Sequence, residues 1–133
     1  MIFLDSWIWI EYFSQDEKYT EVEKIFRGNE KIVISTTVIL EVKYRISKKF
    51  GIEKADSVIN VIENFPDISI VPISIDTAKL AADMRIKYYK AREREISFID
   101  SLHLAAALLT GCKKFYSGDS DFKDIEEIKT MII

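Results

Sequence analysis

The sequence predicts an α/β fold of three layers, α/β/α, in which a central, mainly parallel sheet of four to five strands lies between helices. Short apolar runs rich in β-branched residues alternate along the chain with longer segments whose apolar residues recur at helical spacing. Most of these runs are apolar at successive positions, which is typical of parallel strands covered on both faces.

The chain has 133 residues, and we expect them to form a single domain over residues 1–133. A hydrophobic content of 48% excludes a disordered chain. The net charge of −3 argues against a general nucleic-acid coat protein, although a local basic patch remains compatible with it. One cysteine, Cys112, excludes an internal disulfide and a cysteine-based zinc site. With no signal peptide and no apolar run of membrane-spanning length, we expect a soluble, cytoplasmic protein.

The first strand organises the chain. Met1–Leu4 is a continuous apolar run that stops at Asp5, and a helix is expected from Trp7 to Phe13. A carboxylate at the carboxyl end of such a strand lies where open α/β folds bind ligands. The alternative is that Asp5 serves only as the N-cap of the helix.

The next elements repeat this pattern. Tyr19–Phe26 is expected to be a helix, and Lys31–Ser35 a strand. Thr36 or Thr37 then caps a helix that runs to about Lys49 and is ended by Gly51.

The second half contains four further helices, one of them short, and three strands. Strand Ile68–Ile75 is interrupted by Pro72, which indicates a sheet edge or an irregular end. The most apolar helix, Phe98–Leu109, should be central or lie at an interface. The remaining elements are a helix over Glu53–Phe65, a helix from Asp76-Thr77 to about Arg94, a strand over Lys114–Ser117, a short helix after the turn at Gly118, and a strand over Thr130–Ile133.

Four acids recur at equivalent places in this alternation: Asp5, Glu41, Asp100 and Asp119. In a parallel sheet the strand ends and the first turns of the following helices gather on one rim. Two carboxylates about 5 Å apart repel by roughly 3 kcal/mol at an effective dielectric near 20, so a cluster of four would be partly protonated or would bind cations. Oxygen ligands suit Mg²⁺ or Mn²⁺, and such ions promote hydrolysis of a phosphodiester.

Each acid also has a simpler interpretation. Ser97 and Asp100 fit a capping box. Asp119 and Asp121 fit turn chemistry, and Glu41 fits a solvated helix face.

Four segments in this order resemble the PIN-domain ribonucleases and, among them, the VapC-like toxins of type II toxin–antitoxin systems. The segments are Ile2–Ser6, Thr37–Glu41, Asp100–Ala107 and Ser117–Phe122. Each motif is short, but the ordered set covers nearly the whole chain.

The resemblance implies that Asp5, Glu41, Asp100 and Asp119 are catalytic and bind Mg²⁺ or Mn²⁺. It implies a supporting role for three neighbours, Asp121, Ser6 and Ser117; the family often has threonine where this chain has Ser117. It further implies a metal-dependent endoribonuclease toxin that acts on an RNA substrate, forms a homodimer and is inhibited by a cognate antitoxin protein.

Other residues have two interpretations. His103 is either a general base or a packed residue beside the site, and we favour the second. Trp7 and Trp9 either stack on bases or line the core or a groove. A basic stretch either contacts RNA phosphate or is simply solvated; it comprises Lys43, Arg45, Lys48 and Lys49.

Two rival functions remain open from the sequence. One is an RNA-processing or quality-control nuclease of the same superfamily. The other is a catalytically silent PIN-like module that binds a protein partner.

Overall fold

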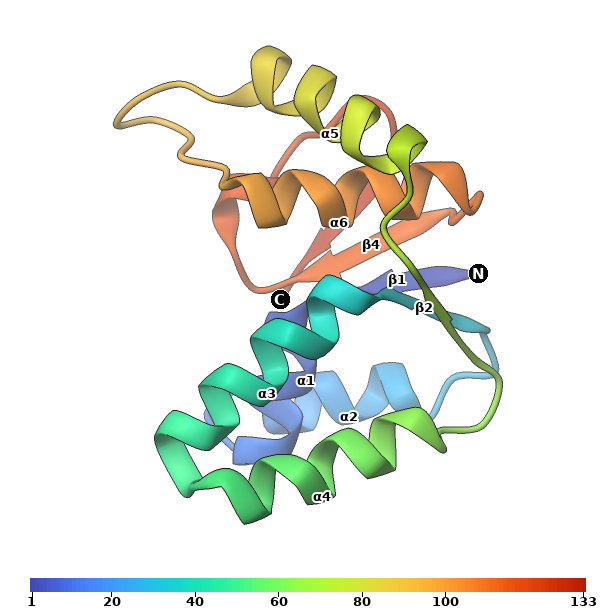
Figure 1. The fold of residues 1–133 in the computed structure, drawn as a ribbon, viewed down its shortest axis with the longest axis vertical. Helices are drawn as coiled ribbons and strands as arrows, with labels where there is room; N and C mark the ends of the chain where they lie inside the picture. Colours follow the sequence, from blue (N-terminus) through green and yellow to red (C-terminus); the bar gives the residue numbers. More distant parts are fainter.

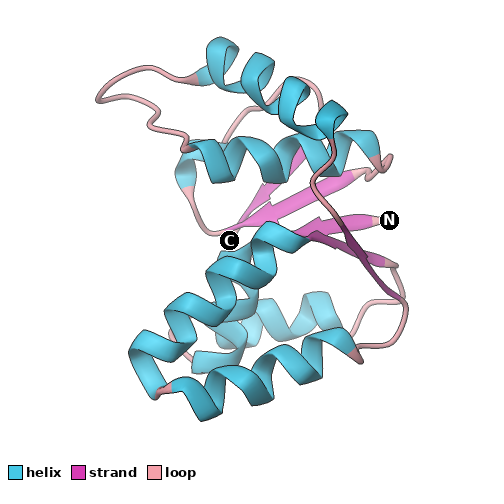
Figure 2. Cartoon of the chain, in the orientation of Figure 1, coloured by secondary structure: helices cyan, strands magenta, loops and turns pink.

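The computed structural model describes all residues, Met1–Ile133, as a five-stranded sheet with helices on both faces (Figures 1 and 2). In chain order the elements are β1 (Ile2–Leu4), α1 (Ser6–Ser14), α2 (Tyr19–Phe26), β2 (Ile32–Ser35), α3 (Thr36–Phe50), α4 (Ile52–Glu63), β3 (Ile68–Val71), α5 (Ile75–Tyr88), α6 (Phe98–Leu109), β4 (Lys114–Ser117), the 3-10 helix η1 (Ser120–Phe122) and β5 (Lys129–Ile132). The predicted α/β fold of three layers is confirmed.

All strand pairs are parallel, and the strand order is β3-β2-β1-β4-β5. Strand β1 is therefore central, and the chain order reverses on its two sides. Helices α1 to α4 lie on one side of the sheet, and α5 and α6 lie on the other (Figure 1). None of the helices combines the length and apolar composition needed to cross a membrane.

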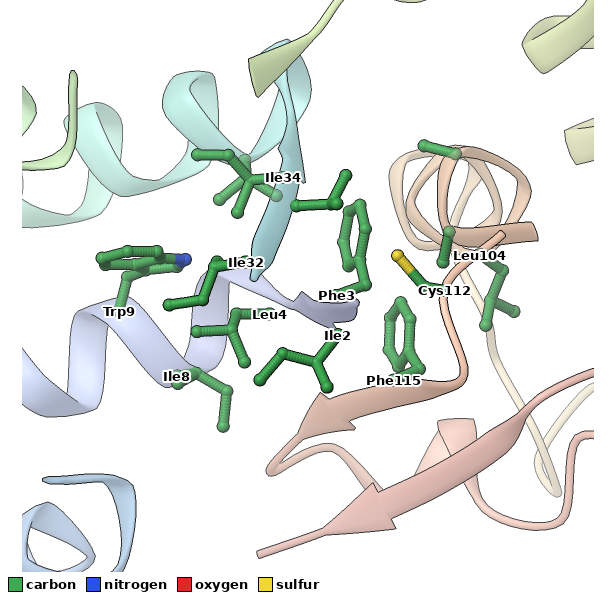
Figure 3. Packing of buried hydrophobic residues seen from close by; sticks show 14 of the residues in the cluster. Ile2, Phe3, Leu4, Ile8, Trp9, Ile32, Ile34, Leu104, Cys112 and Phe115 are labelled. Carbon is green, nitrogen blue, oxygen red and sulfur yellow. The ribbon is translucent and has the colours of Figure 1, made fainter. Parts of the chain in front are cut away.

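The core lies on both faces of β1, which explains why its residues are apolar without alternation. The ring of Phe3 stacks on Phe115 with 5.3 Å between centroids, on the side of α6. On the other face Leu4 packs near Ile8 and Trp9 of α1 (Figure 3). This double burial fixes the end of β1, and with it the position of the next residue, Asp5.

The predicted end of α5 at Arg94 was wrong, because the helix ends at Tyr88. The guanidinium of Arg85 lies 4.4 Å from the Tyr89 ring centroid and 4.1 Å from that of Phe98, and it donates a hydrogen bond to the Ile96 carbonyl. These contacts hold Ile96 and Phe98, where the chain returns toward α6, beside the last turn of α5. Residues 90–94 are charged except for Ala91 and have no apolar face to bury, so nothing favours a longer helix there.

The third strand is also shorter than expected. It ends at Val71, before Pro72, which has no N–H to continue a strand ladder. As predicted, this strand lies at an edge of the sheet. The following helix is capped by Ser74, which forms a capping box with Thr77, so it begins slightly earlier than the Asp76-Thr77 start that the sequence indicated.

Candidate metal centre

A pocket of about 280 Å³ opens at the rim where the carboxyl ends of β1 and β4 meet. The four acids that the sequence singled out, Asp5, Glu41, Asp100 and Asp119, all line it, although they come from segments far apart in the chain. The other lining residues are Ser6, Trp7, Ile10, Glu11, Asp16 and Arg45. Six carboxylates and one guanidinium therefore line the pocket, and this excess of negative charge favours the binding of cations.

Asp5 lies at the base of this pocket and is only 3% exposed. One carboxylate oxygen accepts a hydrogen bond from the Ser117 hydroxyl at 2.8 Å, and the other lies 2.8 Å from His103 Nδ1. Asp5 occupies the N-cap position of α1, but its side chain makes no capping hydrogen bond. The side chain therefore serves the pocket and not the helix end.

Ser117 connects two of the acids. Its buried hydroxyl donates to Asp5 and accepts from the backbone N–H of Asp119 at 3.0 Å. The Asp119 carboxylate in turn accepts the backbone N–H of Asp121 at 2.9 Å, so the expected turn chemistry is present. Asp119 still lines the pocket, which means that its turn role and a ligand role are compatible.

Glu41 is held by the start of α1. The Ser6 hydroxyl donates to its carboxylate at 2.8 Å, and the Glu41 side chain is 20% exposed. Glu41 is thus a pocket residue and not a member of a solvated face. Ser6 directly follows Asp5 in the chain. The start of α1 therefore positions the Asp5 carboxylate and also supplies the hydroxyl that orients Glu41.

Asp100 lies in the first turn of α6 and forms the expected capping box with Ser97. Burial, assisted by the nearby charge of Asp5, raises the pKa of Asp100 to about 6, against the lowering effect of its Ser97 hydrogen bonds. A carboxyl whose ionisation is opposed in this way gains from a cation in the pocket.

This raised pKa predicts a pH dependence of stability. Because the pKa of Asp100 is about 6 when folded and near 3.8 when unfolded, the folded state binds more protons between these values. The stability that protonated Asp100 contributes is complete below about pH 4 and is lost as the pH rises through 6. In metal-free protein, the free energy of unfolding of wild type minus that of Asp100→Asn should fall between pH 4 and 6. Urea titrations at several pH values measure this difference, and a pH-independent difference would contradict the raised pKa.

His103 is completely buried behind Asp5. Burial lowers its pKa, but the hydrogen bond to Asp5 and the charges of Asp5, Glu41 and Asp100 outweigh this and raise it. Its second nitrogen, Nε2, has no hydrogen-bond partner and lies 3.8 Å from the nearest Glu41 oxygen. His103 therefore lies against two of the acids from inside the core, which agrees with a packed residue beside the site.

We expect His103→Gln to retain RNA cleavage to within about tenfold, because water activated by a metal ion would supply the nucleophile without a histidine base. The glutamine amide can still donate a hydrogen bond to Asp5. Single-turnover cleavage rates measured below the melting temperatures of both proteins provide the test. A loss as large as that of Asp5→Asn, at wild-type stability, would mean that His103 is the general base.

The donor set fits a divalent cation. One atom each from Asp5, Asp100 and His103 lie within 4.8 Å of one another, and Glu41 and Asp119 line the same pocket. His103 Nδ1 already contacts Asp5 and its Nε2 faces Glu41 at 3.8 Å, so the carboxylate oxygens of the four acids are the main ligands that the pocket offers. Oxygen ligands beside a pocket with room for water suit Mg²⁺ or Mn²⁺.

Of the remaining candidate residues, some line the pocket and others do not. Asp121 does not line the pocket; burial, followed by the charge of Asp119, raises its pKa. Of the basic stretch on α3, only Arg45 lines the pocket. The other three do not line it: Lys43 pairs with Asp56, Lys48 lies over the Tyr44 ring, and Lys49 reaches the edge of the pocket, where it pairs with Asp16 at 2.7 Å.

Two acids of the pocket, Glu11 and Asp16, were missed by the sequence reasoning. Glu11 is an acid in an otherwise apolar helix, four residues after Trp7, and both residues line the pocket. Because residues four apart share a helix face, the position of Glu11 relative to Trp7 could have predicted that Glu11 lies near the site. Asp16 follows the helix and gives no such signal.

Comparison with known proteins identifies the family of the chain. The family model described as PIN domain matches residues 2–128. No curated protein matches the sequence.

Several solved structures share the fold. VapC20 of Mycobacterium tuberculosis, described as a toxin that cleaves the sarcin–ricin loop, is 19% identical, with 96% of this chain and 98% of that chain covered and a TM-score of 0.79. VapBC2 of Rickettsia felis, solved with a promoter DNA fragment, gives 19% identity, coverage of 100% and 99%, and a TM-score of 0.75. A toxin–antitoxin complex from Klebsiella pneumoniae gives 20% identity, full coverage of both chains and a TM-score of 0.73.

These similarities extend over essentially the full length of both partners, and at such identities they show a common fold. The family match covers nearly the whole chain, including Asp5, Glu41, Asp100 and Asp119. The chain therefore belongs to the PIN-domain family.

Proposed function

We propose that this protein is a metal-dependent endoribonuclease and the toxin of a toxin–antitoxin pair. One observation carries the proposal: Asp5, Glu41, Asp100 and Asp119 come from four separate segments and line one pocket at the point where the strand order reverses. Membership of the PIN-domain family and the shared fold with VapC toxins support it.

In this proposal the four carboxylates hold Mg²⁺ or Mn²⁺, with Asp5 and Asp100 as the innermost pair. When bound, the ion supplies positive charge at the scissile phosphate and lowers the pKa of water. The chain's own residues set the geometry. Ser117 and His103 fix the Asp5 carboxylate, and Ser6 fixes that of Glu41. Asp121 supports the site through its backbone N–H, which orients Asp119.

Arg45 supplies the contact to the RNA backbone in this account. It is the one cation that lines the pocket and has no ion-pair partner, whereas Lys43 and Lys49 are paired with acids. It follows Glu41 by one helical turn on α3, so its guanidinium can reach a phosphate that flanks the scissile one. Lys43, Lys48 and Lys49 belong to the outer part of this basic face.

We expect Arg45→Gln to raise the KM for RNA by about three- to tenfold with little change in kcat, because the contact holds substrate and transition state alike. The slope of log KM against log salt concentration should fall by about one phosphate contact. Lys43→Gln, which removes a charge on the same helix but outside the pocket, is the matched control. Equal KM values and salt slopes for the two variants would exclude a phosphate contact by Arg45.

The experiment that tests the function is cleavage of total RNA by the purified protein, with EDTA and with Mn²⁺ or Mg²⁺. Internal cuts that require the ion are expected. Cleavage in EDTA would exclude metal-dependent chemistry, and a folded protein that cuts no RNA under any condition would favour a silent module that binds a protein.

The biological role needs a separate test. We propose that the protein acts in the cytoplasm as a homodimer and is inhibited by a small antitoxin protein encoded beside it. Its expression should stop growth, and co-expression of the neighbouring protein should restore growth. Metal-dependent cleavage without growth arrest would instead favour an RNA-processing or quality-control nuclease.

A further inference from the structure

The two tryptophans of α1 have different surroundings. Trp9 is completely buried and packs against the rings of Phe26 and Phe65. Trp7 is half-buried and lines the acidic pocket. It also lines a second hollow of about 530 Å³, which shares Trp7, Glu11 and Asp16 with the first. The indole of Trp7 therefore stands between the metal pocket and a neighbouring depression.

The Trp7 ring is held in place by Gly118, which directly precedes Asp119. A Cβ added to Gly118 would lie 2.1–2.4 Å from three atoms of the indole, so only glycine lets the ring lie against the backbone there. A ring fixed in this way loses little side-chain entropy when a ligand stacks on it. The same contact ties the orientation of the indole to the loop that carries Asp119.

The charges of the second hollow restrict what can occupy it. Its walls include Glu11, Asp16 and Glu17, with Lys18 as the one cation that lines it, and the Lys18 amine lies 3.7 Å from Glu21. One oxygen of Asp16 is paired with Lys49 at 2.7 Å, and one oxygen of Glu11 accepts the backbone N–H of Lys18, so the wall keeps a net negative charge. A phosphate would be repelled by this wall. An uncharged planar group that stacks on indole and meets carboxylate oxygens with N–H donors fits it, which describes a nucleobase.

We propose that Trp7 is a stacking platform for the nucleobase next to the scissile phosphate of a single-stranded RNA. The inference rests on the proposed ribonuclease function and names how that pocket holds its substrate. With the scissile phosphate at the acids, the adjacent base lies on Trp7 in the second hollow. Glu11 and Asp16 each keep one carboxylate oxygen without a protein donor, and these oxygens can accept N–H groups from the edge of that base.

A double-mutant cycle between protein and RNA tests the contact. The substrate is a short RNA that contains a mapped cleavage site, compared with copies that lack the base at each position flanking the cut. Base–aromatic stacking predicts a loss of roughly 5–150-fold in kcat/KM for wild type when one flanking base is removed. Trp7→Ala should show the same loss with intact RNA and no further loss with that abasic RNA. Trp7→Phe should recover most of the activity.

Additive losses of activity from the protein substitution and the RNA substitution would overturn the proposal. If Trp7→Ala and every abasic substitution lose activity independently, the indole does not contact a flanking base. Because Trp7→Ala removes packing against Gly118, rates are compared below the melting temperature of each variant. Trp7→Phe, which keeps a ring there, must follow the wild-type pattern for the proposal to stand.

A fluorescence measurement separates this proposal from the nuclease assignment. In an Asp100→Asn background with Mg²⁺, single-stranded RNA pentamers of adenine, cytosine or uracil nucleotides are added to the protein. Quenching by at least one pentamer is expected, and it should disappear in Trp7→Phe and persist in Trp9→Phe. If Trp9→Phe does not fold, the quenching of Trp7→Phe is compared with that of the Asp100→Asn protein alone. Equal quenching in these two proteins would exclude stacking on Trp7.

The two proposals can fail independently. Cleavage by wild type with no quenching by any pentamer would leave the nuclease function intact and exclude stacking on Trp7. Quenching that depends on Trp7, in a protein that cuts no RNA, would keep the base platform and overturn the nuclease function.

Discussion

Asp100→Asn is expected to lower the rate of RNA cleavage at least about a thousandfold while leaving the fold intact. The substitution removes a metal-ligand charge, and the stabilisation that a bound cation gives to a phosphoryl transition state amounts to several kcal/mol, at about 1.4 kcal/mol per factor of ten. The asparagine amide oxygen can still accept the Ser97 N–H, so the capping box survives. Rates with Mn²⁺ and end-labelled RNA measure the effect.

Asp83→Asn is the matched control, because it makes the same chemical change on the exposed surface of α5 outside the pocket. It should retain wild-type rates. Asp5→Asn should also abolish cleavage, but its two oxygens contact Ser117 and buried His103, so that variant changes stability as well. A folded Asp100→Asn protein with wild-type activity would contradict the assignment of the site.

Millimolar Mn²⁺ or Mg²⁺ is expected to raise the melting temperature of the wild-type protein by several degrees. An ion that binds only the folded state adds about 2.7 kcal/mol at a hundredfold excess over its Kd, which is large beside a total stability of roughly 5–15 kcal/mol. For a domain of this length that free energy corresponds to several degrees. Sodium chloride at matched ionic strength should have no such effect.

Asp100→Asn should change both parts of this response. At pH 7.5 its metal-free melting temperature should exceed that of wild type, because ionised Asp100 lies in a pocket that raises its pKa to about 6. Its gain from Mn²⁺ should be smaller. Thermal scans with the same Mn²⁺ response in both proteins would exclude Asp100 as a ligand.

The fold followed from local patterns. The strand over 114–117 and the helices over 19–26 and 98–109 have the predicted bounds, since apolar periodicity, caps and glycines determine them within a few residues. Helix α5 differed because its end depends on Arg85, which stacks between Tyr89 and Phe98. The contact between Arg85 and Phe98 joins residues on either side of the loop between α5 and α6. A local sequence pattern cannot predict such a contact.

In the candidate site too, some features could be predicted from the sequence and others depend on contacts between distant residues. Topology alone indicated that four acids would share one rim, because parallel strand ends gather there. The bond between His103 and Asp5 joins residues 98 positions apart, and it depends on how deeply α6 packs on β1. How closely α6 packs on β1 depends on the whole core and cannot be predicted from either segment alone.

For two of the acids, Asp100 and Asp119, the simpler interpretation proved compatible with the site. Asp100 completes the capping box of α6 with the N-cap residue Ser97, and Asp119 caps η1, yet both side chains line the pocket. Caps lie at the beginning of helices, and both α6 and η1 begin at the rim that carries the pocket. A capping role therefore gives no reason to exclude an acid from a metal site in such a fold.

The central claim is that these acids bind a divalent cation, and titration calorimetry of metal-free protein with Mn²⁺ tests it most directly. Wild type and Asp83→Asn are expected to give matching saturable isotherms at pH 7.5. Asp100→Asn should bind at least about tenfold more weakly, since loss of one ligand charge costs more than 1.4 kcal/mol. Absence of Mn²⁺ binding by wild type, or identical isotherms for all three proteins, would contradict the account.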